Sequence, residues 1–219
     1  MKDNLTYLVF VVDRSGSMSG IAKDMIGGFN AFIKAQRNAK IGECKVFFYQ
    51  FDTDYDRVYE DLLLENVVDL TAETYQPRGS TALYCSLGKT ITELGTRLGS
   101  LPDSEKPSKV LIVTITDGED NSVLANAEDR YTLEKVKEMI KHQSEVYNWD
   151  FTYIGANQDA WSIGNAMGMG GNTKLNYVAS ATGTAVMFDK LSKSTVSYRA
   201  CAGKKFSYDP DDDQNPPIL

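Results

Sequence analysis

Five oxygen-bearing side chains occupy three short segments whose residue types point to metal chemistry. Asp13, Ser15 and Ser17 alternate in VVDRSGSMSG, Thr81 lies in GSTAL, and Asp117 lies in TDG. Side chains at alternate positions of an extended segment point the same way, so the first three can converge on one point. Carboxylate and hydroxyl oxygens select Mg²⁺, Mn²⁺ or Ca²⁺ and disfavour zinc. The segments therefore predict a metal centre built from hard oxygen ligands.

The three segments follow or precede runs that are typical of buried strands and amphipathic helices. Residues 5–12 and 110–115 are nearly continuous apolar runs, as strands covered on both faces must be. Only a short polar turn separates strand 44–51 from strand 57–65, so we expect this pair to be antiparallel. Strands alternate with helical patterns along the chain. This order predicts an α/β fold, a doubly wound, mostly parallel central sheet with one antiparallel edge strand and helices on both faces.

The predicted topology also brings the three segments together. Ligands of such sheets bind where the carboxyl ends of the strands open into loops, and all three segments lie at that edge. A Mg²⁺ ion held mainly by neutral hydroxyls keeps much of its positive charge, and it requires six oxygens in an octahedron. A carboxylate from another molecule is then the natural ligand for a position that faces solvent. We expect a protein partner that supplies an Asp or Glu side chain.

The segments DRSGSM, GSTAL and TDG resemble the metal-ion-dependent adhesion site (MIDAS) of the von Willebrand factor A (VWA) domain family, in the same order along the chain. The resemblance covers about residues 5 to 200. It implies a Rossmann-like fold with Ser15, Ser17 and Thr81 as direct hydroxyl ligands of Mg²⁺. It also implies that Asp13 and Asp117 lie close by and bind the metal directly or through water. Bacterial relatives that act beside an ATPase further imply a larger assembly, in a bacterial or phage protein.

Two other functions are compatible with these residues. A metal-assisted hydrolase or phosphatase needs a base or nucleophile aimed at the metal-bound substrate. The only histidine, His142, lies in a charged helical segment far along the sequence from the serines, so we favour a binding module over an enzyme. The other alternative is a metal-free scaffold in which hydroxyls cap helices, with Ser17 or Ser19 at the first helix and Ser80 or Thr81 at the second.

Residues beside the predicted metal are candidates for contact with a partner. Arg14, Met18 and Tyr84 flank the site, and Arg and Tyr are common anchors at interfaces. Glu119 and Asp120 follow Asp117 directly. They either attract cations and tune the choice of partner or form a solvated acidic loop, and the sequence leaves both interpretations open.

The C-terminal part of the chain has weaker patterns. Residues 181–201 predict a last helix with several Ser and Thr residues, which is either loosely held or merely partly exposed. The resemblance implies that ligand capture moves this helix in some relatives. Residues 204–219 are rich in Asp and Pro, so we expect a disordered tail after a single VWA domain at 1–203.

Composition restricts partners and location. The 219 residues carry a net charge of −7, and an acidic protein repels phosphate backbones, so nucleic acid is not expected as a partner. No stretch approaches the roughly 20 apolar residues of a membrane span. Cys44, Cys85 and Cys201 show no motif spacing, and the first strand lacks a signal cleavage site. We therefore expect free thiols and a cytoplasmic protein.

Overall fold

One six-stranded sheet forms the centre of the computed structural model, which describes residues 2–125, 130–156 and 160–209. The strands are β1 (Lys2–Asp13), β2 (Glu43–Phe51), β3 (Tyr55–Leu63), β4 (Pro107–Thr116), β5 (Asp150–Ala156) and β6 (Lys174–Tyr177). Their order in the sheet is β3-β2-β1-β4-β5-β6. In this described part, β2 and β3 pair antiparallel, and the other four strand pairs are parallel. The predicted sheet, with its antiparallel edge strand, is confirmed.

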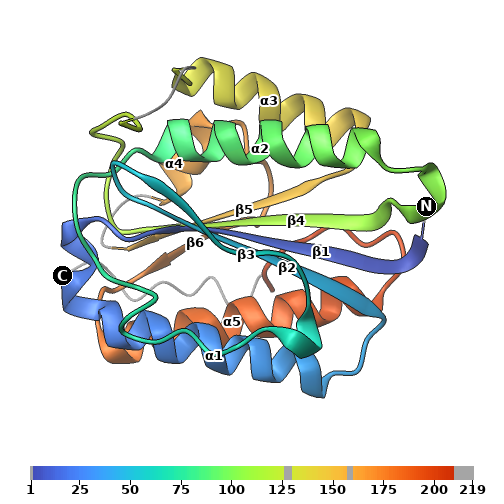
Figure 1. The fold of residues 1–219 in the computed structure, drawn as a ribbon, viewed down its shortest axis with the longest axis horizontal. Helices are drawn as coiled ribbons and strands as arrows, with labels where there is room; N and C mark the ends of the chain where they lie inside the picture. Colours follow the sequence, from blue (N-terminus) through green and yellow to red (C-terminus); the bar gives the residue numbers. More distant parts are fainter. Residues whose placement is uncertain (1, 126–129, 157–159, 210–219) are drawn as a thin grey trace.

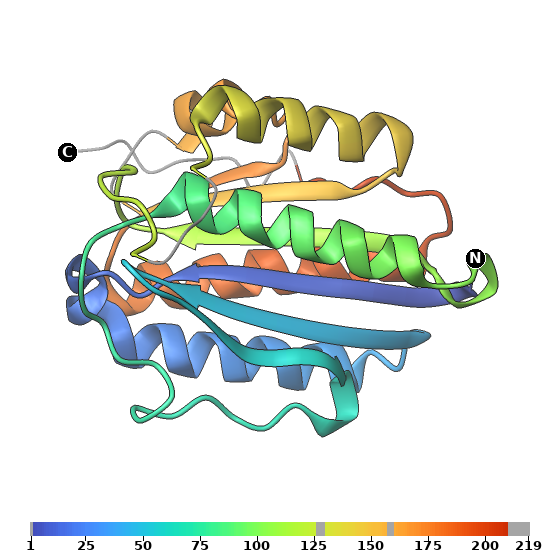
Figure 2. The same ribbon diagram turned by 45° about the horizontal axis from the view of Figure 1, so that its top comes forward.

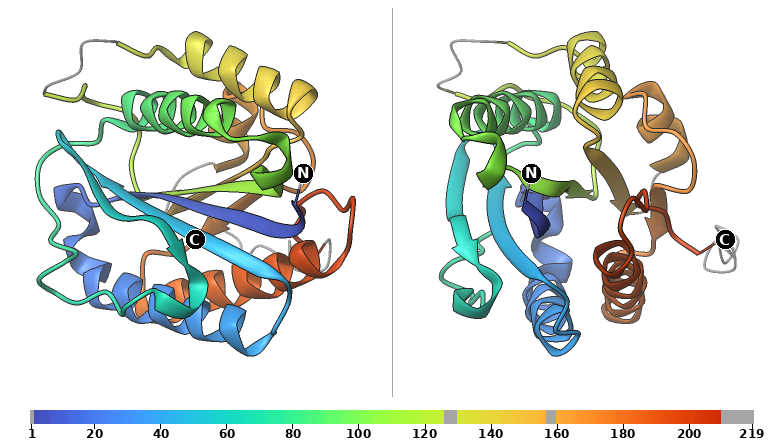
Figure 3. Two further views of the ribbon diagram at one scale, coloured as in Figure 1. Left: turned by 45° about the vertical axis from the view of Figure 1, so that its right-hand side comes forward. Right: turned by 90° about the vertical axis from the view of Figure 1, so that its right-hand side faces the viewer.

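Helices cover both faces of the sheet (Figure 1). The helices are α1 (Ala22–Asn38), α2 (Leu83–Ser100), α3 (Leu133–Val146), α4 (Ala160–Ala166) and α5 (Ala181–Ala200). In Figure 1, α1 and α5 lie below the sheet and α2 and α3 lie above it, and Figure 2 shows α2 over the central strands. The right panel of Figure 3 shows the three layers end-on. A 3-10 turn, η1 (Gly16–Ile21), leads from the β1 loop into α1.

The central strand β1 is buried on both faces because its alternating side chains serve two hydrophobic cores. Leu8 and Phe10 join the core formed with α1 and α5. Val9 and Val11 join the core formed with α2 and α3. All four side chains are 0% exposed. Successive side chains of a strand point to opposite faces, so a continuous apolar run is what a central strand of a three-layer fold requires.

The last helix, α5, packs tightly against α1 despite its weak apolar pattern. A Cβ added to Gly28 of α1 would lie 2.0 Å from the Phe188 ring of α5, so only glycine allows this approach. Further along, the Gln36 amide donates a hydrogen bond to the Ser192 carbonyl oxygen at 3.1 Å. Arg199 donates to the Gln36 carbonyl oxygen at 3.2 Å. Polar groups can be buried when they have hydrogen-bond partners. Because this interface uses such groups and a glycine, the sequence of α5 shows no regular spacing of apolar residues. The helix is anchored rather than loosely held.

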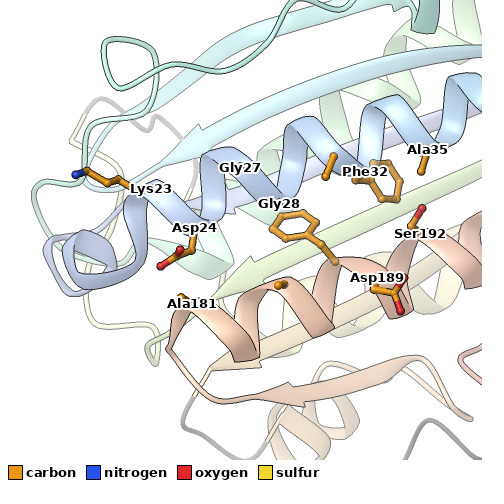
Figure 4. Close-up of a pocket in the computed structure, with 12 residues that line it drawn as sticks. Lys23, Asp24, Gly27, Gly28, Phe32, Ala35, Ala181, Asp189 and Ser192 are labelled. Carbon is orange, nitrogen blue, oxygen red and sulfur yellow. The ribbon is translucent and has the colours of Figure 1, made fainter.

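A groove of about 380 Å³ runs between α1 and α5 (Figure 4). Small residues line much of it, among them Gly27, Ala35 and Ala181, and the charged side chains of Lys23 and Asp24 lie along its rim. The groove follows from the close approach of two helices that carry small side chains. None of the five predicted metal-site residues lines it.

The predicted tail boundary at residue 203 is wrong for residues 204–209. Phe206 and Tyr208 are buried in the core beside α5, at 2% and 3% exposed. The Tyr208 backbone N–H donates to the Asn172 carbonyl oxygen at 2.7 Å, and its hydroxyl lies 2.9 Å from the Thr152 hydroxyl. Two aromatic side chains in an otherwise polar segment therefore extend the domain. The remainder of the predicted tail, residues 210–219, lies outside the described residues.

Several smaller predictions are also decided by the structure. Residues 52–54 form the polar turn between β2 and β3, and His142 is exposed on α3. All three cysteines are free; Cys44 and Cys85 are buried and Cys201 is exposed. Burial raises the pKa of the Cys44 thiol to about 12, so this thiol is unreactive at neutral pH. Within the described residues, no helix is long and apolar enough to span a membrane.

Candidate metal centre

Asp13 ends β1, and its fully buried carboxylate ties this strand to its neighbour β4. One carboxylate oxygen accepts a hydrogen bond from the Ser15 backbone N–H at 2.6 Å, and the other accepts from the Thr116 hydroxyl at 2.5 Å. The Tyr75 hydroxyl donates to the Asp13 carbonyl oxygen at 2.5 Å. An Asp that accepts a hydrogen bond from the second following N–H bends the chain. Asp13 therefore starts the turn that presents the two serines.

The serine hydroxyls connect the first loop to the loop after β4. The Ser15 and Ser17 hydroxyl oxygens lie 3.0 Å apart. Ser17 in turn donates to a carboxylate oxygen of Asp117 at 2.7 Å, across 100 residues of sequence. Three of the predicted ligands thus form one hydrogen-bonded chain, and Asp13 holds its start. The alternation of Asp and Ser brings these side chains together as expected from the sequence.

The second loop is held against the first by backbone hydrogen bonds. The Gly16 N–H donates to the Gly79 carbonyl oxygen at 3.2 Å, and the Arg78 N–H donates to the Arg14 carbonyl oxygen at 2.7 Å. Gly79 has φ +66°, a left-handed conformation that favours glycine. A Cβ at this position would also lie 3.3 Å from the Cβ of Asp52. The glycine of GSTAL is therefore required for the loop to approach the β2–β3 turn.

Thr81 lies between the second loop and the loop after β4. It is 2% exposed, and its backbone N–H donates to the Asn121 side-chain oxygen at 2.9 Å. A Cβ added to Gly118 would lie 3.5 Å from the Thr81 hydroxyl oxygen, so that hydroxyl faces the TDG segment. The structure therefore brings all five predicted residues to the carboxyl edge of β1 and β4, at the left of Figure 1.

The helices beside the site are not capped by its hydroxyls. No side-chain cap hydrogen bond is formed at the start of η1, α1 or α2 by the residue that precedes each of them. Instead, a carboxylate oxygen of Asp120 accepts from the Tyr84 backbone N–H in the first turn of α2, at 3.0 Å. Ser19 donates to the Gly16 carbonyl oxygen within its own turn. The hydroxyls of Ser15, Ser17 and Thr81 are thus not used as helix caps, and Asp120 is more than a solvated acid.

Two of the three predicted partner contacts are wrong because the side chains are buried. Arg14 is 5% exposed and forms ion pairs with Asp52 at 3.2 Å and with Asp56 at 2.6 Å. Met18 is 0% exposed and belongs to the core with α1 and α5. Arg14 instead fixes the first loop to the β2–β3 turn. Tyr84 is partly buried against α2's core.

The electrostatics of the site fit a divalent cation. Burial raises the pKa of Asp13 to about 6, against the opposing effect of the hydrogen bonds from Thr116 and Ser15. Burial also raises the pKa of Asp117. The basic side chain that follows Asp13 in the sequence, Arg14, forms ion pairs with Asp52 and Asp56. Two carboxylates whose ionised forms are penalised, surrounded by neutral hydroxyls, are the donor set that a hard cation stabilises.

Sequence reasoning missed the residues that hold the loops in place. Thr116, Tyr75 and Asn121 all bond to site residues, yet none belongs to the alternating Asp-Ser pattern. The one feature of the sequence that could have identified Thr116 is its position, at the end of β4 and directly before Asp117. Among the described residues, no group of three or more His, Cys, Asp or Glu side chains could hold a metal. A metal site here must therefore draw on hydroxyl oxygens.

Comparison with protein-family models and with curated protein sequences gives no match for this chain. Solved structures do match. The von Willebrand factor domain of the type V pili tip protein Mfa5 from Porphyromonas gingivalis aligns over 91% of this chain and 97% of its own, with 10% identity and a TM-score of 0.57. The pilus adhesin SpaC from Lactobacillus rhamnosus GG aligns over 90% of this chain and 30% of its own, with 15% identity and a TM-score of 0.63.

A third neighbour carries a metal at the corresponding motif. Proximal thread matrix protein 1 from the mussel byssus, in a structure with a zinc-occupied MIDAS motif, aligns over 87% of this chain and 46% of its own. Its identity is 13% and its TM-score is 0.54. This chain thus spans less than half of that protein and of SpaC. Identities this low concern the fold alone. The chain has the fold of a von Willebrand factor A domain.

Proposed function

We propose that this chain is a protein-binding module in which a divalent cation, Mg²⁺ by preference, bridges to an Asp or Glu side chain of a partner protein. The observation that carries the proposal is the hydrogen-bonded chain from Ser15 through Ser17 to Asp117, with the buried Asp13 at its start. These side chains come from two loops that lie 100 residues apart, and their convergence has no role in capping a helix.

Each residue has a distinct part in this proposal. The hydroxyls of Ser15, Ser17 and Thr81 would hold the cation as neutral ligands, while Asp13 and Asp117 supply negative charge close by. A bound cation would supply electrostatic attraction for an outside carboxylate. Because three of the proposed ligands are neutral, the site would leave part of the cation's positive charge unbalanced. This would favour the binding of one further carboxylate. Mn²⁺ and Ca²⁺ suit the same oxygen donors.

The structural neighbours support a role in protein interaction. They include a pilus adhesin, a minor pilin from Streptococcus sanguinis and a pilus tip protein. One neighbour has a zinc-occupied MIDAS motif, so a protein of this fold can hold a metal at such a motif. The proposal does not extend to enzymatic activity, because the exposed His142 lies on α3 and both acids of the site are engaged with the serine and threonine side chains.

The test measures cation binding first. We expect Mg²⁺ titration by calorimetry to show one site in the wild-type protein and none in Asp13→Ala or Ser17→Ala. Ser80→Ala is the matched control, because Ser80 is an exposed serine next to Thr81 and should bind like wild type. A wild-type protein without affinity for Mg²⁺ or Mn²⁺ would establish the metal-free scaffold instead.

Partner capture provides the second arm. Immobilised protein should retain partners from lysate in Mg²⁺ and lose them in EDTA, and Asp13→Ala should retain none in either. Partners that persist in EDTA contradict the proposed bridge. Metal-dependent turnover of phosphate or ester substrates that is lost in Asp13→Ala would favour the hydrolase.

We also propose that the chain acts in a reducing, cytoplasmic compartment within a larger assembly beside an ATPase. The three free cysteines support the location, and the resemblance to bacterial VWA domains supports the assembly. Pilus proteins among the neighbours provide the alternative of an exported protein. Cell fractionation followed by native-gel analysis of the retained partners distinguishes the two.

A further inference from the structure

Tyr177 ends β6 and lies in the core beneath the candidate metal centre. It pairs in register with Ala156 at the end of β5. Both residues belong to the core cluster that also contains Val12 and Ile115, which immediately precede the ends of β1 and β4. Tyr177 is 7% exposed. Its ring therefore belongs to the layer that supports the loops carrying the predicted ligands.

The Tyr177 hydroxyl is buried and has no hydrogen-bond partner among the described residues. A buried hydroxyl without a partner costs free energy, because it has lost its hydrogen bonds to water. Phenylalanine would fill the same space without that cost. The hydroxyl is therefore unfavourable for the stability of the fold, and its donor is unused in the core.

Strand register places Tyr177 level with Asp117, because Thr116 pairs with Gly155 and Gly155 pairs with Asn176, and Asp117 and Tyr177 are the next residues along their chains. Burial raises the pKa of Tyr177, and the negative charges of Asp117 and then Asp13 raise it further. A second buried phenol, Tyr75, is influenced by the same two carboxylates and by Tyr177. The Tyr75 hydroxyl, however, already donates to the Asp13 carbonyl oxygen. Both tyrosines are thus influenced by the same two carboxylates, but within the described part of the chain only the Tyr75 hydroxyl donates a hydrogen bond.

We propose that the Tyr177 hydroxyl is a positioning group for the loaded metal centre, where it donates a hydrogen bond to the Asp117 carboxylate directly or through one water. This inference rests on the proposed function. In the structure, the Asp117 carboxylate accepts the Ser17 hydroxyl at 2.7 Å. If a cation takes the Ser17 oxygen as a ligand, a second donor to the Asp117 carboxylate would help to hold that carboxylate in place beside the cation. Groups that orient metal ligands in this way typically contribute 10- to 100-fold in metal affinity.

The matched pair Tyr177→Phe and Tyr75→Phe tests the assignment, since each change removes one oxygen from a buried ring. In EDTA, Tyr177→Phe should raise Tm by about 3 °C, because it removes an unpaired hydroxyl. Tyr75→Phe should lower Tm by about 3 °C, because it leaves a buried carbonyl oxygen without its donor. In calorimetric titration with Mg²⁺, Tyr177→Phe should bind about tenfold more weakly than wild type.

The combination of higher stability and lower metal affinity is what a purely structural tyrosine would not give. Unchanged Mg²⁺ affinity in Tyr177→Phe overturns the inference while leaving the proposed function intact. A lower Tm for Tyr177→Phe in EDTA also overturns it, since the hydroxyl would then already have a partner. A wild-type protein that binds neither Mg²⁺ nor Mn²⁺ refutes the proposed function and this inference together.

Discussion

The substitution Asp13→Asn separates the electrostatic cost of the candidate site from its hydrogen bonding. Asn keeps the shape of the side chain and can accept from the Ser15 N–H as Asp13 does at 2.6 Å. Its amide can donate to the Thr116 oxygen, because the Thr116 hydroxyl can turn to the Gly118 carbonyl oxygen at 3.1 Å. The variant should therefore fold, and what it loses is the negative charge.

The size of the effect follows from the pKa of Asp13, which burial raises from 3.8 to about 6. A carboxyl group whose pKa is higher in the folded than in the unfolded protein destabilises the fold once it is ionised. At neutral pH this difference corresponds to about 3 kcal/mol in metal-free protein. The folded state binds the extra proton as pH falls through about 6, so the wild type should regain about 1.4 kcal/mol between pH 7 and pH 5.

Urea unfolding in EDTA at several pH values provides the measurement. The free energy of unfolding of wild type minus that of Asp13→Asn should rise by about 1.4 kcal/mol as pH falls from 7 to 5. At pH 7, Asp13→Asn should be the more stable protein by up to about 3 kcal/mol. Taking the difference removes contributions shared by both proteins, such as that of Asp150, whose pKa burial also raises.

Saturating Mg²⁺ should reverse the order of stability at pH 7, because the cation stabilises the ionised carboxylate of the wild type and has less affinity for the variant. Parallel pH profiles for the two proteins in EDTA would refute the assignment of a strained charge at Asp13. A variant that is less stable than wild type at pH 7 in EDTA would show that the hydrogen bonds, not the charge, dominate at this position.

Three further experiments test the packing of the fold and of the first loop. In chemical denaturation, Gly28→Ala should lower the free energy of unfolding by about 2 kcal/mol, because its Cβ would overlap the Phe188 ring of α5. Gly27→Ala, where the Cβ meets no atom of the described residues, should raise the free energy of unfolding by up to about 1 kcal/mol. Arg14→Ala should destabilise by about 3 kcal/mol in the same assay, since it leaves the buried Asp52 with weaker compensation. A thiol reagent should modify Cys201 rapidly in the native protein and the two buried cysteines only on unfolding; three fast thiols would contradict the packing.

Most of the fold could be predicted because the central strands serve two cores at once. The unbroken apolar run of residues 5–12 is interpretable only as a strand covered on both faces, and the structure places it as β1 in the middle of the sheet. The short turn at 52–54 likewise decided that β3 is antiparallel to β2. These features are local in sequence, so no knowledge of distant contacts was needed.

The packing of α5 and of residues 204–209 could not be read from the sequence. The α1–α5 interface depends on Gly28 and on hydrogen bonds from Gln36 and Arg199, which carry no apolar periodicity. Phe206 and Tyr208 are two isolated aromatic residues in a polar segment, and the Asp and Pro content of residues 204–219 led to the prediction of a disordered tail. Both cases depend on a specific partner elsewhere in the chain, which a pattern in one segment does not contain.

In the candidate site, too, the residues of one short motif could be predicted, but the contacts between distant loops could not. The convergence of Asp13, Ser15 and Ser17 could be predicted, because side chains at alternate positions of an extended segment point the same way. The arrangement of the loops depends instead on backbone hydrogen bonds such as Gly16 to Gly79, and on side chains that accept or donate across loops, such as Asn121 at Thr81. Each of these contacts joins loops that are far apart in the sequence, so no pattern within one segment predicts it.

If the site binds a cation as proposed, neutral hydroxyls would be most of its ligands, and this has a consequence for partner binding. The affinity for the cation alone would be limited by the small number of charged ligands, so a partner carboxylate would add a large share of the compensating charge. The cation and the partner would then bind cooperatively, and each would raise the affinity of the other by the same factor. This coupling would not require α5 to move, because it would lie in the charge at the metal. The buried Gln36–Arg199 contacts and the close approach at Gly28 would have to break for that helix to shift, so we expect little change in the hydrogen exchange of α5 when Mg²⁺ and a partner bind.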